Sequence, residues 1–362
     1  MKTYTRISGK VKQVPIRASK RREIYEILKL VYTPEEAKLL ASSFDMPFLD
    51  PKTVEEVADE LGLTREHVEK VFSRLASKGA LFEFIDRKSG KTYYSLLPLV
   101  PGLYELLLPM GPMNDVKRKV ARLFEKYYMD GWGMEIAASN YPIARIIPVE
   151  ARISPEVEVM PFERASEIIN NARTIALLNC VCRLTNNNCD NPLEVCLSFD
   201  ASAEYAIRRI GAREISKEEV LEVLRLAEKH GLVHTTTNHQ HRPAFICNCC
   251  PCCCGFLGTL TKLKNPRGFV KSNFMPKIDH EACKRCDTCV NSCPFNALYH
   301  HYPHAEDLHD DEIRVIEENC VGCGVCSVKC PQNAITMVKV RDYVPVERAR
   351  EMWMRFEAER IH

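Results

Sequence analysis

Apolar residues recur at helical spacing in two consecutive stretches near the start of the chain. The first stretch places four of them on one helical face: Val54, Val57, Ala58 and Leu61. The second repeats the spacing with a further set: Val68, Val71, Phe72 and Leu75. Thr64 stands where a helix cap is expected, and Gly62 and Gly79 stand where glycine ends a helix. The pattern predicts two short helices joined by a tight turn, with another helix before them over residues 34–44.

Two short runs rich in aromatic and aliphatic residues follow these helices. Residues 81–85 and 93–97 are typical of strands, and the polar segment 87–91 between them is typical of a hairpin turn. The order of helix, tight turn, helix and hairpin resembles a winged-helix module over roughly residues 34–98. We take this module to extend to residue 113.

Later stretches add further helices and a strand. Residues 115–130 and 162–171 show helical spacing, and residues 174–178 form a β-branched and aliphatic run that predicts a strand directly before Cys180. From residue 344 the tail predicts an amphipathic helix with an apolar stripe: Val346, Ala349, Trp353 and Phe356. We expect this stripe to pack into the core, and docking of a partner is the alternative.

Charge gives little indication of a polyanionic partner. The chain of 362 residues has 50 Lys and Arg against 48 Asp and Glu, a net charge of +2, which makes no global case for nucleic acid. Residues 1–30 hold nine basic residues against two acidic ones. We expect a solvated basic arm leading into a short helix, and an arm that contacts phosphate or a partner is the alternative.

Neither a signal peptide nor a membrane span is expected. The N-terminal stretch has no apolar core segment, and the most apolar stretch, 93–113, contains four prolines and Glu105. The hydrophobic fraction of 46% is that of a folded chain. We therefore expect a soluble, cytoplasmic protein of two or three domains.

Cysteine is confined to one part of the chain. The first 179 residues contain none, and all eighteen lie between Cys180 and Cys330. In the absence of an export signal, such dense packing is typical of metal ligands and not of disulfides.

Two stretches share a spacing that indicates their chemistry. Both have the pattern C-x2-C-x2-C-x3-C-P, with Cys283, Cys286, Cys289 and Cys293 before Pro294, and Cys320, Cys323, Cys326 and Cys330 before Pro331. The repeat resembles the bacterial two-cluster 4Fe-4S ferredoxin family over residues 276–340. Three cysteines at intervals of three wrap a loop around one iron–sulfur cube, whereas zinc sites typically use two separated cysteine pairs.

The resemblance implies a crossed set of ligands, because the fourth cysteine of each motif binds the other cluster in two-cluster ferredoxins. One 4Fe-4S cluster then takes Cys283, Cys286, Cys289 and Cys330, and the other takes Cys320, Cys323, Cys326 and Cys293. The first loop is flanked by charged residues and the second by glycine and valine, so their potentials need not be equal. The connection over 298–311 is expected to be a solvated insertion, with metal binding as the alternative for its histidines, His300, His301, His304 and His309.

Ten further cysteines match no ferredoxin spacing. They form two groups, the first Cys180, Cys182, Cys189 and Cys196, and the second Cys247, Cys249, Cys250, Cys252, Cys253 and Cys254. Adjacent residues of an extended chain point to opposite sides. The pairs Cys249/Cys250 and Cys252/Cys253 are therefore expected to serve two metal centres, or one centre and a redox-active thiol pair. One or two additional iron–sulfur clusters are the preferred interpretation, with zinc and thiol chemistry as alternatives.

The predicted fold is α+β and multidomain. It divides into a basic arm and short helix (1–33), a winged-helix-like module (34–113), a central Cys-rich α/β domain (114–272), a two-cluster ferredoxin-like domain (273–341) and a C-terminal amphipathic helix (342–362). The combination is similar to winged-helix and ferredoxin proteins associated with anaerobic microbes. No dinucleotide-binding, ATPase or nucleophile motif accompanies it.

The predicted function is transfer of single electrons at low potential to or from a partner oxidoreductase. Two alternatives are a redox-sensing regulator that binds DNA through the winged helix, and a reductase that uses the central cysteines. A protein partner is preferred to DNA because the basic residues of segment 64–78 are interleaved with Glu66 and Glu69.

Overall fold

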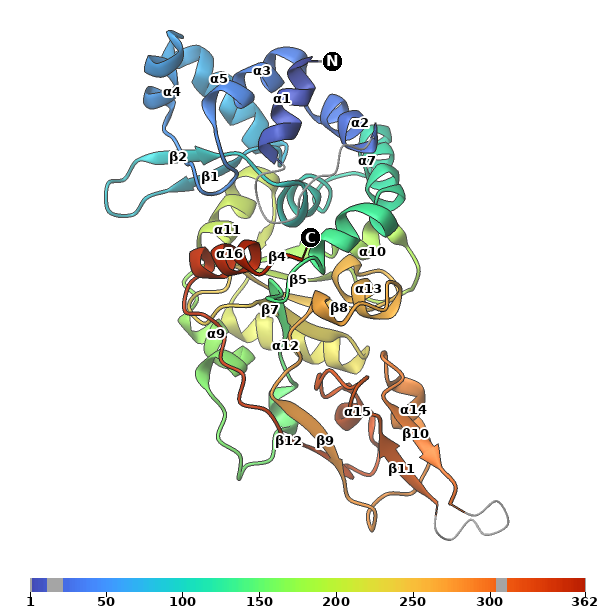
Figure 1. Ribbon diagram of the computed structural model, residues 1–362. Helices are drawn as coiled ribbons and strands as arrows, with labels where there is room; N and C mark the ends of the chain where they lie inside the picture. The colour runs from blue at the N-terminus through green and yellow to red at the C-terminus, as the bar shows by residue number, and fades with distance from the viewer. Residues whose placement is uncertain (1, 12–21, 304–310, 362) are drawn as a thin grey trace.

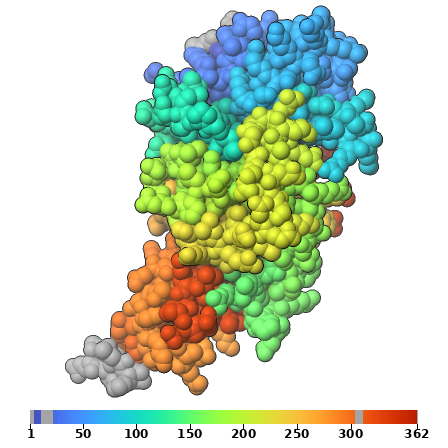
Figure 2. Space-filling model, turned by 180° about the vertical axis from the view of Figure 1, so that it is seen from behind, coloured from blue at the N-terminus to red at the C-terminus, as the bar shows by residue number. Residues whose placement is uncertain are grey.

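The computed structural model describes residues 2–11, 22–303 and 311–361. Helices of the N-terminal part gather at one end, a six-stranded sheet crosses the middle, and the segment with the two cysteine motifs projects at the other end (Figure 1). Figure 2 shows the same order from behind, with the cysteine-motif segment as a separate lobe. Among the described helices, none has both the length and the apolar character needed to cross a membrane.

The N-terminal part is mostly helical. Its elements are α1 (Lys2–Val11), α2 (Arg22–Val31), α3 (Pro34–Ser43), α4 (Val54–Leu61), α5 (Arg65–Ser77), β1 (Phe82–Ile85) and β2 (Thr92–Ser95). Thr33 and Thr53 cap α3 and α4 through capping boxes, and Gly62 ends α4 in the left-handed conformation, with a φ of 64°. Strands β1 and β2 pair antiparallel. The predicted helices and hairpin are confirmed to within a few residues at their ends.

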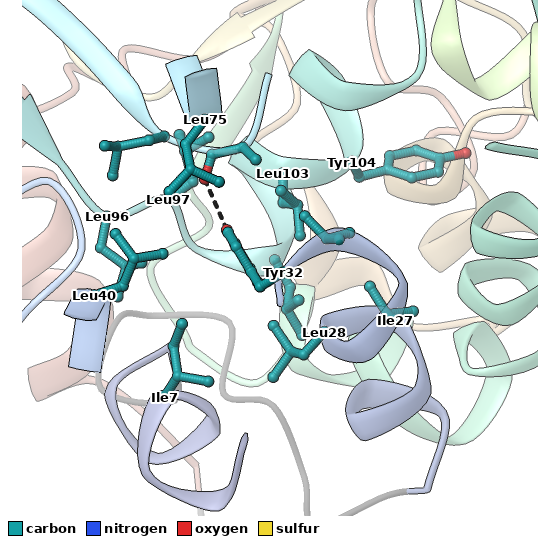
Figure 3. Packing of buried hydrophobic residues seen from close by; sticks show 14 of the residues in the cluster. Ile7, Ile27, Leu28, Tyr32, Leu40, Leu75, Leu96, Leu97, Leu103 and Tyr104 are labelled. Atoms are coloured by element: carbon teal, nitrogen blue, oxygen red, sulfur yellow. Dashed lines mark hydrogen bonds between the residues drawn. The ribbon is translucent and has the colours of Figure 1, made fainter. Parts of the chain in front are cut away.

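The prediction of a solvated basic arm is wrong for α1, which is a helix with a buried face, whereas the short helix predicted after the arm is present as α2. Helices α1 and α2 contribute Ile7, Ile27 and Leu28 to the N-terminal core, where all three are buried (Figure 3). The Tyr32 hydroxyl donates to the Ala80 carbonyl oxygen at 2.7 Å and joins these helices to the rest of that core. The count of charged residues did not reveal the apolar face of these two helices, which the basic residues flank. Residues 12–21 lie outside the described residues.

The middle of the molecule is built on one sheet. Its strands, in spatial order, are β3 (Ala144–Ile146), β7 (Val233–Thr237), β8 (Phe245–Cys249), β5 (Glu194–Phe199), β4 (Ile175–Asn179) and β6 (Arg213–Glu214). All pairings between these strands are antiparallel. The central region is therefore α+β and not the α/β domain expected. Helices lie in several of the connections between its strands, but every neighbouring pair is antiparallel, so none of these connections is a crossover between adjacent parallel strands.

Helices cover both faces of this sheet. On one face, α9 (Ala165–Asn171) and α12 (Lys217–Lys229) pack through Ile169 and Leu224 against Leu197 and Ile246. On the other, α11 (Asp200–Tyr205) packs against β4. Further helices complete the middle and its junction with the N-terminal part: α6 (Tyr104–Leu107), α7 (Asp115–Lys126), α8 (Gly133–Ile136), α10 (Val181–Asn186) and α13 (Gly255–Thr261). The strand predicted just before Cys180 is confirmed as β4.

The cysteine-motif segment has two small antiparallel sheets and two short helices. Its elements are β9 (Phe274–Ile278), α14 (Thr288–Ser292), β10 (Leu298–His301), β11 (Glu312–Val315), α15 (Val325–Lys329) and β12 (Ile335–Lys339). Strand β9 pairs with β12, and β10 pairs with β11. The predicted insertion over 298–311 therefore begins as a strand, while His304 and His309 lie outside the described residues.

The C-terminal helix begins later than predicted. Helix α16 (Ala349–Ala358) begins five residues later than residue 344, because residues 344–346 run beside the central sheet, where Gln240 donates its backbone N–H to the Val346 carbonyl at 3.0 Å. Met352 and Phe356 carry its buried face, while Ala349 is exposed. The predicted core role of the stripe is confirmed for Phe356 and for the half-buried Val346 and Trp353, which pack on the N-terminal core, and is wrong for Ala349.

Candidate metal centres

Two loops present the motif cysteines, and we call residues 283–289 the outer loop and residues 320–326 the inner loop. Each loop turns through two residues with positive φ, at equivalent positions. These are Arg285 (55°) and Asp287 (56°) in the outer loop, and Gly322 (73°) and Gly324 (82°) in the inner loop. The two loops therefore share one backbone conformation, which lets three cysteines converge on one side of the chain.

The loops differ in their surroundings. Cys320, Cys323 and Cys326 of the inner loop are all buried. In the outer loop Cys286 is exposed and Cys283 is half-buried. The inner loop lies against the middle of the molecule, because Val149 donates its backbone N–H to the Cys323 carbonyl at 3.1 Å.

The fourth cysteine of each motif lies beside the other loop. Cys293 lines a small cavity together with all three inner-loop cysteines: Cys320, Cys323 and Cys326. Burial raises the pKa of Cys323 to about 12, and the neighbouring Cys293 and Cys320 thiols contribute. In the other half, burial raises the pKa of Cys289 to about 11, with contributions from Cys283 and Cys330.

The donor set suits iron–sulfur cubes. Each set has four thiols, three from one loop and one from the other motif, and all of them except the exposed Cys286 are partly or fully buried. A cube carries its ligands on four separate iron corners, so their sulfur atoms lie further apart than those around a single ion. Among the described residues, these cysteines do not form a group of donors within 4.8 Å of one another, unlike the group described next.

Four of the ten central cysteines converge tightly, and we call them the four-thiol set: Cys189, Cys250, Cys252 and Cys253. All four sulfur atoms lie within 4.8 Å of one another. Cys189 Sγ is 3.7 Å from Cys250 Sγ and 3.8 Å from Cys253 Sγ. Burial alone would raise the pKa of Cys189. Hydrogen bonds from the Asn191 backbone and the other three thiols outweigh burial and lower this pKa to about 7. The set favours negative charge on one sulfur at least.

The other six cysteines form a second group, the six-thiol set. Each of its members influences the pKa of the next, in the order Cys180, Cys182, Cys254, Cys249, Cys247 and Cys196. Hydrogen bonds from Cys247 and Cys254 lower the pKa of Cys249 to about 6. Hydrogen bonds from Cys196 and Cys249, together with burial, raise the pKa of Cys247 well above its usual value. Two of the six cysteines are buried and four are half-buried, and together they supply more thiols than one cube needs.

Local structure explains how adjacent cysteines are divided. Cys249 ends β8, and the next residue, Cys250, points to the other set, as alternation along an extended chain predicts. The predicted division between Cys252 and Cys253 is wrong, because residues 251–253 form a turn and both side chains join the four-thiol set. The division falls instead at Cys254, which caps α13.

Polar side chains that the sequence did not single out support both sets. Arg183 is 1% exposed and lies between them, donating to the Asn248 carbonyl at 2.9 Å and to Cys250 Sγ at 3.7 Å. Its Nε–H is buried and has no acceptor among the described residues. The Asn run before Cys189 and the proline at position 251 were the only local signals of these turns.

One comparison with known proteins finds a match. The family described as "4Fe-4S dicluster domain" matches residues 275–331. This part of the chain is a ferredoxin-like iron–sulfur segment. It belongs to a larger protein, and no curated protein matches the chain. Together with the central cysteine group, it indicates iron–sulfur electron transfer in general terms.

The ferredoxin-like segment and the central cysteines share one packed core. A single buried cluster contains Val321, Cys323 and Val325 of the inner loop together with Cys249 and Cys254 of the six-thiol set. Helix α15, which follows the inner loop, also contacts α12. The inner loop is therefore the side of the ferredoxin-like segment that faces the six-thiol set.

Proposed function

We propose that the protein transfers single electrons at low potential between a partner oxidoreductase and a third iron–sulfur site held by the six-thiol set. The observation that carries this proposal is the buried core that Cys323 of the inner loop shares with Cys249 and Cys254 of the six-thiol set. When bound, iron–sulfur clusters supply one-electron redox chemistry at a potential set by their surroundings.

Each cysteine group has its own task in this proposal. Cys283, Cys286, Cys289 and Cys330 hold one 4Fe-4S cluster, and Cys320, Cys323, Cys326 and Cys293 hold the other. The crossed assignment is supported by the cavity that Cys293 shares with the inner loop. The exposed Cys286 makes the outer loop the part of the segment that a redox partner can approach.

The six-thiol set fits a further cluster for three reasons. Its thiols outnumber the four that a cube requires, all six are buried or half-buried, and Arg183 lies beside them with an unused N–H donor. A buried cation reduces the cost of holding several thiolates, and its N–H can donate to a cluster sulfur.

Iron counting tests this part of the proposal. Anaerobically purified protein is expected to contain about twelve irons per chain, since each cube holds about four. The double variant Cys249→Ala with Cys254→Ala should lose about four of them and keep the other eight or so. Ser42→Ala, at an exposed position of α3 in the N-terminal part, is the matched control. About eight irons in the wild-type protein would exclude the third cluster, and this count does not require the variant to fold.

We further propose that residues 34–113 form a winged-helix-like module that docks a protein and does not read DNA. Several of its basic side chains are already engaged within the chain. Arg74 pairs with Glu36 at 2.9 Å, Lys78 donates to the Val31 carbonyl at 2.8 Å, and Arg87 in the hairpin turn pairs with Glu204 of α11. These pairs reduce the positive charge available to phosphates.

A salt titration distinguishes docking from DNA recognition. The intact protein is titrated against its own promoter region and against random duplex, oxidised and reduced, at several salt concentrations. We expect weak binding that is equal on both duplexes and indifferent to redox state. A promoter preference of about a thousandfold, the low end for specific binders, with a steep salt dependence would make the redox-sensing regulator the better proposal.

A further inference from the structure

The four-thiol set has the dimensions of a site for one metal ion. Its sulfur–sulfur separations are 3.7 Å for Cys189–Cys250, 3.8 Å for Cys189–Cys253 and 3.9 Å for Cys252–Cys253. Zinc binds thiolates tetrahedrally at about 2.3 Å, which places its ligand sulfurs about 3.8 Å apart. The observed spacing matches that edge length, whereas an iron–sulfur cube needs its ligands further apart.

The ligands come from two segments that are distant in sequence. Three of them follow β8 within four residues, and Cys250 and Cys253 have the C-x2-C spacing typical of zinc sites. The turn is closed by the Cys254 N–H, which donates to the Cys250 carbonyl at 2.9 Å. Cys189 comes from the loop after α10. A metal here therefore joins that loop to the turn after β8.

Hydrogen bonds hold the ligands in place. Asn191 Nδ2 donates to Cys189 Sγ at 3.4 Å, and Arg183 donates to Cys250 Sγ at 3.7 Å. Asn186 and Asn188 donate to the carbonyls of Cys253 and Cys252 at 2.7 and 3.0 Å. Lys262 Nζ also donates to the Cys252 carbonyl, at 2.9 Å. Donors to ligand sulfurs and to the adjacent backbone are the usual outer shell of a structural metal site.

We infer that Cys189, Cys250, Cys252 and Cys253 bind a single Zn²⁺ ion in an all-thiolate tetrahedral site that is separate from every iron–sulfur site of the chain. Four protein ligands leave no open position, so the ion is structural and takes no part in electron transfer. Zn²⁺ and four thiolates carry a net charge of −2, and Arg183 and Lys262 offset it. The ion fixes the turn between Cys249 and Cys254, and so fixes the spacing of two members of the six-thiol set.

Metal analysis of the full chain tests this inference. Elemental analysis of anaerobically purified protein should find one zinc per chain, and zinc-edge X-ray absorption should find four sulfur neighbours at about 2.3 Å. Absence of zinc would overturn the inference, as would nitrogen or oxygen neighbours, or iron held by these four thiols. These measurements use the wild-type protein and count zinc apart from iron, so they stand whether or not a third cluster exists.

Matched cysteine variants locate the ion. Cys252→Ala should abolish zinc binding and leave the ferredoxin-like clusters intact, whereas Cys196→Ala in the six-thiol set should keep the zinc. The milder Asn191→Ala should speed zinc loss to a chelator by about tenfold, the low end for an outer-shell partner. Zinc lost from Cys196→Ala and retained in Cys252→Ala would overturn the assignment by placing the ion in the other set.

Discussion

The outer and inner loops have the same cysteine spacing and the same pair of positive-φ turns, yet one faces water and the other faces the central sheet. At the two turn positions the outer loop carries Arg285 and Asp287, and the inner loop carries Gly322 and Gly324. A Cβ on Gly322 would lie 2.1 Å from the Phe274 carbonyl oxygen, so the inner loop has no room for a side chain there. One local conformation thus serves two roles, and the packing around it decides which.

The largest expected effect comes from exchanging the fourth cysteine. Cys293→Ser should abolish the cluster of the inner loop, with a loss of about four irons, because Cys293 shares its cavity with the inner-loop cysteines. EPR of the reduced protein measures which cluster remains. Loss of the outer-loop signal alone would show that each motif ligates its own cluster.

The second-largest effect is expected from adding a side chain at the turn of the inner loop. Gly322→Ala is expected to disrupt the inner loop, because φ there is 73° and the added Cβ would also lie 2.2 Å from Ser272 Oγ. The matched change in the outer loop, Arg285→Gly, should leave both clusters in place, since glycine readily adopts positive φ. Iron content and EPR signal per chain measure both variants. Equal damage from the two substitutions would contradict the role assigned to packing.

Because the two loops differ in exposure, their clusters should differ in how fast oxidation destroys them. Under brief oxidation, the outer-loop cluster is expected to decay several-fold faster than the inner one, because Cys286 is exposed while Cys320, Cys323 and Cys326 are buried. EPR or Mössbauer spectra at timed intervals follow the two signals. Faster loss of the inner-loop signal would show that burial does not protect it.

The smallest effect concerns charge. Lys284→Gln removes a cation from the outer loop, and it should lower the reduction potential of the outer-loop cluster, since a cation favours the more negative reduced state. The change should stay below about 1 kcal/mol, the usual limit for an exposed charge. Redox titration followed by EPR measures it. The inner-loop potential serves as the internal control and should not move.

The parts predicted from sequence were those that short segments determine. The caps and apolar spacing of α3 to α5 are local, and the C-x2-C-x2-C loop wraps its own ligands. The division of the central cysteines was not predictable in this way, because Cys189 meets Cys250 across 61 positions of sequence. The burial of Arg183 between the two sets also depends on tertiary packing, which its place directly after Cys182 does not reveal.

Two further errors have the same origin. The apolar face of α1 was obscured by its basic residues, and only its packing against α3 shows that it belongs to the core. The antiparallel order of the central sheet depends on which strands meet, and its neighbours are often distant in sequence, as β3 and β7 are. Helical or strand character can be inferred from a local period, but strand order cannot.

We propose above all that the cluster of the inner loop lies close enough to a third iron–sulfur cluster in the six-thiol set for the two to interact magnetically. EPR of the fully reduced wild-type protein, compared with the Cys249→Ala and Cys254→Ala double variant, tests it most directly. In the wild-type protein, we predict that the EPR signal of the inner-loop cluster is broadened by both the outer-loop cluster and the cluster of the six-thiol set. The double variant should show the simpler pattern of two interacting clusters. Identical spectra from the two proteins, at equal iron content, would contradict the claim.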